Sequence, residues 1–471
     1  MRCGLWGPSE DDQPPGAVAS QIPVAPAPVG VPAKEKAREK AGTSGCAPAT
    51  RMAQARTKGL SRLLFSSAIV EHRLLWTIAT VMSTLTALVL PRCCPQSAAA
   101  GIVAIVVSLM LGASAASGAE PAPAMQKVRI SPDKKHFVFA GSDKVFVPWG
   151  FNYLGTFGEL VEESWATDWA RVEKDFRAMR KLNANVVRIH LQFPTYMKGP
   201  QEVDPAELKR LAKLLDLARD TGLYLDITGL NCFRLKAIPA WYDQMEEAER
   251  WQSQAVFWQA IARTCAGHPA VFCYDLMNEP VVGGPPKAGE PRWVGGELGG
   301  FHFVQRLTTN PGKRGHTEIA EAWVVKLTTA IRQHDPHTPI TVGVIPWAHV
   351  WPTAKPLFYS PEVGKHLDFV SIHLYPGKGE VDKAIKALAV YDVGKPLVVE
   401  ETFPLACSIE ELNQFIDGTA DRTDGWISHY FGHTIEEHRK GAEPEGESVA
   451  KFVAYWRDKA DAVISARQKL R

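Results

Sequence analysis

The sequence predicts an α/β fold of the closed (β/α)8 class, the TIM barrel, forming a single catalytic domain. From about residue 128 to the C-terminus, short runs rich in β-branched residues alternate with amphipathic helical patterns. Eight such runs with helices between them are typical of one closed parallel barrel. A doubly wound open sheet is the alternative, but no glycine-rich nucleotide-binding turn follows the first strand.

Each predicted strand is a short apolar run that ends at polar or turn-forming residues. In chain order the runs are Lys144–Phe151, Asn185–Leu191, Leu223–Leu230, Ala270–Met277, Pro339–Ile345, Leu367–Leu374, Pro396–Glu401 and Gly425–Phe431. The helical patterns between and after them are Asp168–Leu182, Pro205–Thr221, Trp251–Cys265, His316–His334, Lys383–Tyr391 and Glu447–Lys469. In the first of these helices, Val172, Phe176 and Met179 recur at helical spacing and predict one buried face.

The composition is that of a folded globular protein. Of 471 residues, 45% are hydrophobic and 22% are charged, which excludes a disordered chain, a collagen and a polytopic membrane protein. Lys and Arg total 53 and Asp and Glu total 51, for a net charge of +2, so nucleic acid is not an expected partner. We expect a monomer.

The N-terminal quarter differs from the rest. Residues 1–60 are proline-rich and carry a charge run, which predicts disorder. Residues 61–119 form a hydrophobic leader with apolar runs at 74–90 and 98–116. The second run is followed by small residues, as in a signal peptide cleaved near Ala119, and Met82 is a candidate internal start. The barrel domain is expected over 126–471.

Two locations follow from this leader. A cleaved leader predicts a secreted or periplasmic protein. A retained leader predicts a membrane anchor with an extracytoplasmic catalytic domain, because the apolar runs approach the length that spans a bilayer. Membrane contact is expected only through an uncleaved leader.

Eight cysteines are too few for a disulfide scaffold of this length. Four of them fall in the barrel region: Cys232, Cys265, Cys273 and Cys407. They allow up to two disulfides or four buried thiols, and the sequence leaves both readings open.

Two carboxylates stand where a barrel places its catalytic groups. Glu279 follows the fourth predicted strand in Asn278-Glu279-Pro280, and Glu401 ends the seventh. In a TIM barrel the carboxyl ends of the strands meet at one face, so we expect these acids to face each other. Most glycoside hydrolases need two carboxyl groups that face each other across the bond to be cleaved.

At this point the sequence resembles glycoside hydrolase family 5. The motifs that carry the resemblance are Phe151-Asn152-Tyr153, Asn185-Val-Val-Arg188-Ile-His190, Met277-Asn278-Glu279-Pro280, Ser371-Ile-His373-Leu-Tyr375-Pro376 and Lys395-Pro396 with Glu401. They span about residues 140–435 in the family's order. The resemblance implies that Glu279 is the general acid/base and that Glu401 is the nucleophile. Glu400 competes for the second role, but the spacing from Lys395-Pro396 favours Glu401. Strand alternation then turns Glu400 toward the helix layer or the adjoining loop.

The resemblance also implies a set of substrate-binding and supporting residues: Asn152, Arg188, His190, Asn278, His373, Tyr375 and Trp426. An Arg or Tyr bonded to the nucleophile keeps that carboxylate ionised. Asn278 resembles the family residue that binds the sugar 2-hydroxyl. Many family members carry a Trp on strand eight that stacks under the sugar; Trp426 is the candidate, although His429 is an alternative occupant of that position.

Two further regions are less regular. Many family members have a His near the end of strand three, where this chain has Asp226 and Asn231, and we assign neither a role. The stretch 281–315, which holds Trp293, Phe301, His302 and Arg306, is expected to be a long loop. Its aromatic side chains either stack on a sugar or pack within the protein, and the sequence leaves both readings open. Trp347, His349 and Trp351 after strand five are candidates of the same kind.

These observations together predict a retaining glycoside hydrolase that cleaves β-linked poly- or oligosaccharide, with an endo-β-glycanase acting on glucan or mannan as the first choice. An exo-acting β-glycosidase or a glycolipid-cleaving enzyme is the alternative within the family. A barrel that binds glycans without cleaving them is the alternative of another class. The expected partner is a carbohydrate, with no metal and no other cofactor.

Overall fold

The computed structural model describes residues 124–155, 159–429, 431–441 and 446–470. The predictions for residues 1–60 and 61–119 lie outside these ranges. Within them, no helix is both long enough and apolar enough to cross a membrane.

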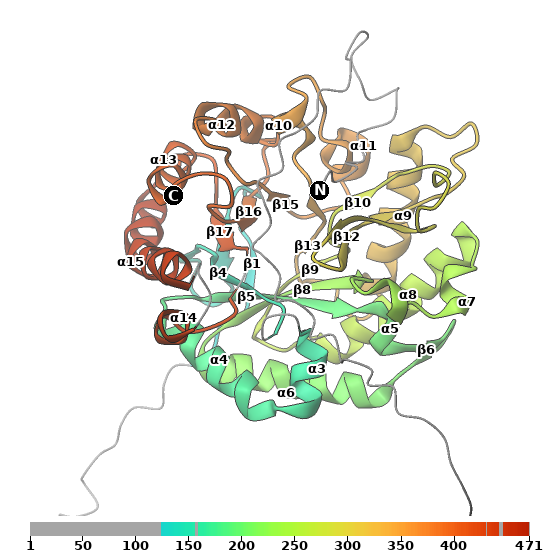
Figure 1. Cartoon of the computed structure of the whole chain (residues 1–471), viewed down its shortest axis with the longest axis horizontal. Helices are drawn as coiled ribbons and strands as arrows, with labels where there is room; N and C mark the ends of the chain where they lie inside the picture. The colour runs from blue at the N-terminus through green and yellow to red at the C-terminus, as the bar shows by residue number, and fades with distance from the viewer. Residues whose placement is uncertain (1–123, 156–158, 430, 442–445, 471) are drawn as a thin grey trace, which may run out of the picture. The chain divides into compact units, whose positions relative to one another are not determined.

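A parallel sheet closed on itself forms the centre of the fold (Figure 1). Its strands are β4 (Trp149–Tyr153), β5 (Val186–Gln192), β8 (Tyr224–Asn231), β9 (Val271–Asp275), β13 (Ile340–Thr341), β14 (Gly343–Val344), β15 (Val370–His373), β16 (Leu397–Thr402) and β17 (Gly425–Ser428). The order β13-β9-β8-β5-β4-β17-β16-β15-β14 begins and ends on segments separated only by Val342. These two segments are halves of one strand, so the nine labelled strands make an eight-stranded barrel, and the predicted fold is confirmed.

Helices surround this barrel (Figure 1). The longer ones are α3 (Val161–Thr167), α4 (Trp169–Lys181), α6 (Pro205–Thr221), α8 (Glu247–Cys265), α9 (His316–Arg332), α12 (Val381–Ala389), α13 (Ile409–Gly418) and α15 (Gly446–Lys469). Short helices are α5 (Phe193–Tyr196), α7 (Ala240–Asp243), α10 (Trp347–Val350), α11 (Pro361–Gly364) and α14 (Ile435–Lys440), with 3-10 turns η2 (Leu235–Ala237) and η3 (Leu357–Tyr359). A small hairpin, β6 (Met197–Gly199) with β7 (Glu202–Val203), follows α5.

Local signals explain where these helices begin and end. The Asp204 side chain caps α6 by accepting from the Ala206 N–H at 2.8 Å, and Gly222 ends the helix with φ of +72°. The predicted helix Pro205–Thr221 therefore has the bounds that are observed. Helix α13 was not predicted, although Ser408 and Glu411 form a capping box at its start.

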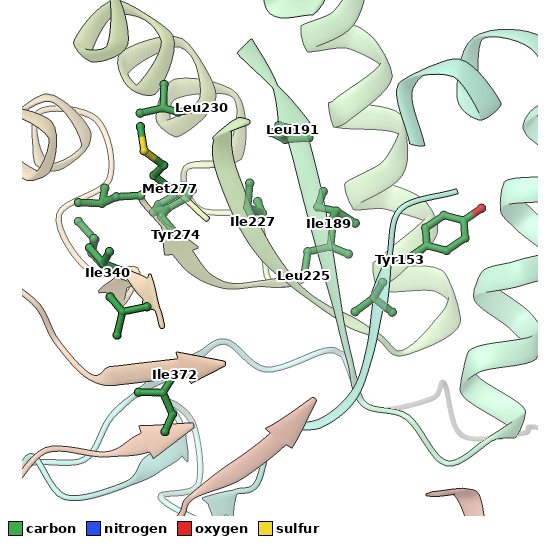
Figure 2. Packing of buried hydrophobic residues seen from close by; sticks show 14 of the residues in the cluster. Tyr153, Ile189, Leu191, Leu225, Ile227, Leu230, Tyr274, Met277, Ile340 and Ile372 are labelled. Carbon is green, nitrogen blue, oxygen red and sulfur yellow. The ribbon is translucent and has the colours of Figure 1, made fainter. Parts of the chain in front are cut away.

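The apolar residues of the strands face the helices. Figure 2 shows part of this layer, including Ile189, Leu225 and Ile372. These side chains are fully buried. Their strand neighbours Arg188 and Asp226 point the other way, into the barrel, because side chains alternate across a strand. The barrel interior is therefore polar toward one end.

The opposite end of the barrel is closed by a small antiparallel sheet. It consists of β1 (Val128–Ile130), β2 (Phe137–Phe139) and β3 (Val145–Phe146). Phe137 packs edge-on against Phe272 and Phe369, with ring centroids 5.0 and 5.1 Å apart. The predicted strand Lys144–Phe151 is therefore wrong as one element, since it contains β3 and the start of β4 with Pro148 between them.

The four cysteines of the barrel, Cys232, Cys265, Cys273 and Cys407, are free thiols. Of the two readings that the sequence left open, the structure supports thiols. The first three are buried and Cys407 is half-buried.

Close contact between the first two barrel strands makes Gly150 critical for stability. A Cβ at this position would lie 1.7 Å from the Val186 carbonyl oxygen of the neighbouring strand. We expect Gly150→Ala to lower the free energy of unfolding by about 3 kcal/mol or more, since backbone atoms must shift. Denaturant unfolding measures this loss. The matched control is Gly284→Ala, where a Cβ meets nothing within 4 Å, and equal stability of the two variants would contradict the prediction.

Candidate active site

The two predicted catalytic glutamates meet at the carboxyl ends of the strands. Glu279 follows β9 and Glu401 lies in β16, and their carboxylate oxygens lie within 4.8 Å of each other and of a His373 ring nitrogen. The Glu279 N–H donates to the Gly343 carbonyl at 2.9 Å, and Glu279 has φ of +48°. A left-handed conformation at a residue other than glycine is strained, and such strain concentrates at functional sites.

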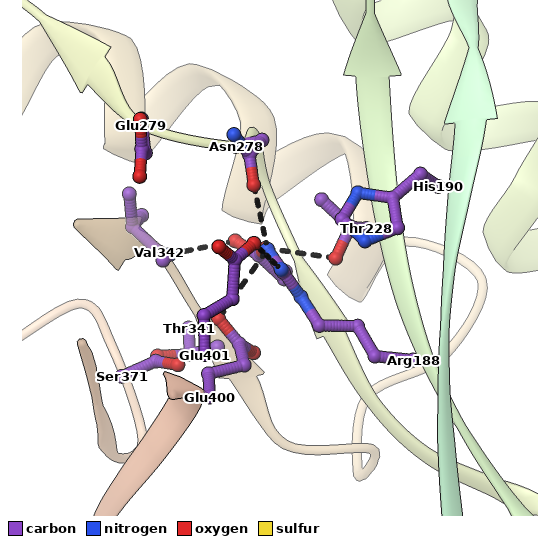
Figure 3. A network of polar contacts seen from close by, with 12 residues as sticks. Arg188, His190, Thr228, Asn278, Glu279, Thr341, Val342, Ser371, Glu400 and Glu401 are labelled. Atoms are coloured by element: carbon purple, nitrogen blue, oxygen red, sulfur yellow. Dashed lines mark hydrogen bonds and ion pairs between the residues drawn. The ribbon is translucent and has the colours of Figure 1, made fainter. Parts of the chain in front are cut away.

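A buried guanidinium lies at the centre of the site. The Arg188 side chain is fully buried, and Figure 3 shows it reaching from β5 toward Asn278, Glu400 and Glu401. Arg188 Nη1 donates to Glu401 Oε1 at 2.5 Å, and Nη2 donates to Asp275 Oδ2 at 2.7 Å. Nη2 also donates to Asn278 Oδ1 at 3.1 Å. One cation thus binds residues from two strand ends, those of β9 and β16.

Glu401 is held as an anion. Besides Arg188, the Tyr375 hydroxyl donates to Glu401 Oε2 at 2.6 Å, and His429 Nδ1 lies 3.3 Å from the same oxygen. Burial opposes ionisation, but the charge on His373, the hydrogen bond from His429 and the charge on Arg188 outweigh it and lower the pKa of Glu401 well below its usual value. An attacking carboxylate needs this state.

Glu279 has a different environment. Its side chain is 16% exposed, compared with 8% for Glu401, and Oε1 lies 2.9 Å from His373 Nδ1. Burial lowers the pKa of His373, but the charge on Glu401 and the hydrogen bonds to Glu279 and Glu400 raise it to about 10. His373 is therefore an imidazolium that donates to Glu279 at neutral pH.

Asn152 and His190 act behind these groups and do not line the open face. Asn152 is 1% exposed and donates to the carbonyls of Glu400 at 2.9 Å and Ser428 at 2.8 Å. Its side-chain oxygen accepts from Arg188 Nη1 and from His190 Nε2, each at 2.9 Å. Burial and the charge on Arg188 lower the pKa of His190 well below its usual value, so His190 is neutral.

The orientation predicted for Glu400 is wrong. Its carboxylate faces the barrel interior, with Oε2 3.3 Å from His373 Nε2 and 3.5 Å from Arg188 Nη2. The cause is a β-bulge: Ile372 pairs with Val399, but His373 pairs with Glu401, so Glu400 is an extra residue in β16. Strict alternation fails at a bulge, and both glutamates point inward.

The role predicted for Trp426 is also wrong. Trp426 is fully buried and packs against Trp149 in the layer beneath the helices, with ring centroids 6.3 Å apart. It cannot stack on a sugar there. His429, the alternative occupant, is the residue of this strand end that contacts Glu401, and its Nδ1 lies 2.7 Å from the Tyr375 hydroxyl.

The stretch after strand four contains regular structure. Its strands are β10 (Pro280–Val281), β11 (Val294–Leu298) and β12 (Phe301–Arg306). Of the two readings for its aromatic side chains, packing holds for Trp293, which is buried and donates to the Asp243 carbonyl. Arg306 is buried as well and donates to the Pro291 carbonyl. Phe301 and His302 are half-buried.

This β11–β12 hairpin lies against the site. The Asn278 Nδ2 donates to the Phe303 carbonyl at 3.0 Å, and the His302 N–H donates to the Phe233 carbonyl at 2.8 Å. The rings of Phe233 and Phe303 lie 5.3 Å apart, and Phe233 lies 5.6 Å from His190. Further along the chain, Trp347 and Trp351 pair at 5.3 Å and are half-buried, and His349 is half-buried beside them.

The sequence analysis did not assign the buried carboxyl groups that balance the charge of Arg188. Asp275 accepts from Arg188, from Thr228 Oγ1 at 2.9 Å and from the Gly343 N–H at 2.8 Å. Asp226 is fully buried below them. The available signal was a charged residue within an apolar strand on the face shared with Arg188, because an inward-pointing charge in a barrel needs a partner.

Glu279, His373 and Glu401 are the one group of three among the described residues whose donor atoms are close enough to hold a metal ion. The chemistry does not fit, because His373, with its pKa near 10, carries protons on both nitrogens and has no lone pair to offer. We therefore derive no step through a metal.

An eight-stranded barrel with a carboxylate pair at its carboxyl face defines a glycoside hydrolase of the TIM-barrel class. The sequence profile of cellulase, glycosyl hydrolase family 5, matches residues 150–403. The chain belongs to this family and is a glycoside hydrolase that acts on O-glycosyl bonds. No curated protein sequence matches the chain.

Solved structures with a similar fold are distant in sequence. The exo-β-1,4-mannosidase Op5Man5 from Opitutaceae bacterium strain TAV5 is 18% identical over 72% of this chain, with a TM-score of 0.53, and the match spans 63% of the mannosidase. The catalytic domain of Thermobifida fusca endoglucanase Cel5A is 17% identical over 72% of this chain and 98% of its own, with a TM-score of 0.47. The β-1,4-mannanase from the sea hare Aplysia kurodai is 18% identical over 71% and 97%, with a TM-score of 0.49.

The reassignment of Trp426 is testable. We expect Trp426→Ala to lower the free energy of unfolding by about 3–5 kcal/mol, as for other buried aromatic residues. KM of the folded fraction stays within about twofold, because the ring does not reach the open face. His429→Ala removes a side chain that is 31% exposed beside Glu401. We expect this variant to raise KM and to leave the free energy of unfolding nearly unchanged. Unfolding curves and steady-state kinetics measure both effects, and a large rise in KM for Trp426→Ala would contradict the assignment.

Proposed function

We propose that this enzyme cleaves β-linked glucan or mannan with retention of anomeric configuration, and that it acts within the chain. One observation carries the mechanism: the carboxylate oxygens of Glu279 and Glu401 lie within 4.8 Å of each other. Retaining enzymes have carboxyl groups about 5–5.5 Å apart, whereas inverting enzymes need about 6.5–9.5 Å to admit a water. The glucan and mannan choice rests on the family, whose profile is named for cellulase.

The first step of the proposed reaction forms a glycosyl-enzyme. A carboxylate oxygen of Glu401 attacks the anomeric carbon while the bond from that carbon to the leaving oxygen breaks. Glu279 donates its proton to the leaving oxygen. Arg188, Tyr375 and His429 hold the attacking carboxylate ionised and oriented until it reacts.

The second step releases the sugar. Glu279, now a carboxylate bonded to His373, takes a proton from water, and the water oxygen attacks the anomeric carbon. The bond to Glu401 breaks and the configuration is restored. Asn278 precedes Glu279 and accepts from Arg188, which also binds Glu401. Its resemblance to the family residue supports a contact with the sugar 2-hydroxyl, where hydrogen bonds strengthen in the transition state.

Variants of the two glutamates should separate their roles. Removing general acid catalysis costs about 10²–10⁴-fold. We expect Glu279→Gln to lose this factor on unactivated glycans but much less in the first step on an aryl β-glycoside whose leaving group needs no proton. Glu401→Gln should lose activity on both, because no nucleophile remains.

The measurement is hydrolysis of β-glucan, mannan, xylan and aryl β-glycosides, with product configuration followed by NMR. Glu362→Gln, which changes an exposed glutamate in α11, is the control. Inversion of configuration, or full activity of Glu401→Gln, would overturn the mechanism.

The β11–β12 hairpin should contact the leaving group. Glu279 protonates the leaving oxygen, so the departing sugar lies on the side of Glu279, where Asn278 holds the hairpin through Phe303. Aromatic rings offer apolar faces to pyranoses. We expect Phe301→Ala to lower kcat/KM on an oligosaccharide about three- to tenfold, and to change it little on an aryl glycoside without a leaving sugar.

Val325→Ala, an exposed apolar truncation on α9, is the control for this comparison. An equal loss on both substrates would contradict a leaving-group role for Phe301.

A further inference from the structure

Glu400 lies inside the barrel, below the two proposed catalytic glutamates. The bulge in β16 places its carboxylate between His373 and Arg188, and none of its side chain is exposed. Gly343 leaves room for it, since a Cβ there would lie 2.5 Å from Glu400 Oε2 and 2.6 Å from His373 Nε2. The barrel is therefore shaped to accept a third carboxylate at this point.

A fourth carboxyl group, that of Asp226, completes the arrangement. It is fully buried, and its charge acts on that of Glu400 inside the barrel. Ionising both of these buried carboxyl groups is unfavourable, so one carries a proton. Burial and the charge on Glu400 raise the pKa of Asp226 well above its usual value. Burial opposes ionisation of Glu400, but the charge on Arg188 and the hydrogen bond from His373 lower its pKa to about 2.

The charges form a chain that ends at Glu279. His373 lies between two carboxylates, with Nδ1 2.9 Å from Glu279 and Nε2 3.3 Å from Glu400. The other titratable groups facing Glu400 are Arg188, Asp226, Cys273, Asp275 and Tyr359. Those facing His373 or Glu279 are His190, Tyr375 and Glu401.

We propose that Glu400 is a positioning residue of the active site: a buried counter-ion that, together with Glu401, holds His373 as an imidazolium whose Nδ1 donates to Glu279. This inference rests on the proposed roles of Glu279 and Glu401. Two cations, His373 and Arg188, lie beside the carboxylate pair, and Glu400 contacts both of them. The negative charge of Glu400 favours the protonated form of His373, and that form orients the Glu279 carboxyl group.

The test is the pH profile of kcat/KM for Glu400→Gln. Removing a negative charge from inside the barrel favours loss of protons by the ionisable groups around it. We expect both limbs of the bell-shaped profile to move about one pH unit toward acid. A purely structural role would lower the maximum without moving the limbs, and limbs at the parent positions would overturn the proposal.

Two variants serve as matched controls. Glu400→Asp keeps the charge, and Asp226→Asn replaces a neutral acid by a neutral amide of similar size. Both should keep the limbs within a few tenths of a unit of the parent. Movement of the limbs in Glu400→Asp as large as in Glu400→Gln would show that packing, and not charge, is responsible, and would overturn the proposal.

A second measurement needs neither a folded Glu400→Gln variant nor a substrate. The ring nitrogens of His373, assigned by their loss in His373→Gln, are followed by NMR in the parent protein between pH 5 and 9. Two protonated nitrogens up to at least pH 8 support the proposal, and a neutral ring at pH 7 overturns it. If no glycan is cleaved, the proposed function fails, while this titration still decides whether His373 is the imidazolium that the proposal requires.

Discussion

The active site depends on one buried cation. A guanidinium inside a barrel has lost its water, so its charge must be met by carboxylates and its N–H groups by acceptors. Arg188 meets this demand with Asp275, Glu401 and Asn278 at 2.5–3.1 Å and with Glu400 at 3.5 Å. Because the Arg188 guanidinium needs these partners, residues from β9, β16 and the segment after β9 lie around this one side chain. The same contacts that stabilise Arg188 orient the nucleophile.

The two proposed catalytic carboxyl groups differ because their surroundings differ. Glu401 accepts from Arg188 and Tyr375 and lies near His429, which favours its charged form. Glu279 has a single close cation, His373, whose other nitrogen faces Glu400. The barrel thus separates a carboxylate that must attack from a carboxyl group that must give up a proton, as double displacement requires.

Strand alternation explains both the successes and the failures of the sequence predictions. It correctly placed Arg188 and His190 on one inward face, because β5 is regular there. It failed at Glu400, because the bulge adds one residue to β16 and no local pattern marks it. The family's usual side chain at this strand end predicts a sugar contact for Trp426. Trp426 instead lies on the face of β17 that is turned toward the helices, where it packs against Trp149. The capping box formed by Ser408 and Glu411 is a local sequence signal that indicates the start of α13.

By itself the sequence determined the eight-stranded barrel, six of the helices around it and the strand ends that carry Glu279 and Glu401. These follow from periodicity, capping and motif order, which are local properties. Only the tertiary structure decided that Glu400 points inward, that Asp226 and Asp275 lie beneath the site, and that the β11–β12 hairpin is bonded to Asn278. These facts depend on register between strands and on the pairing of buried charges across the barrel. Both arise from contacts between residues far apart in the chain, which no local pattern encodes.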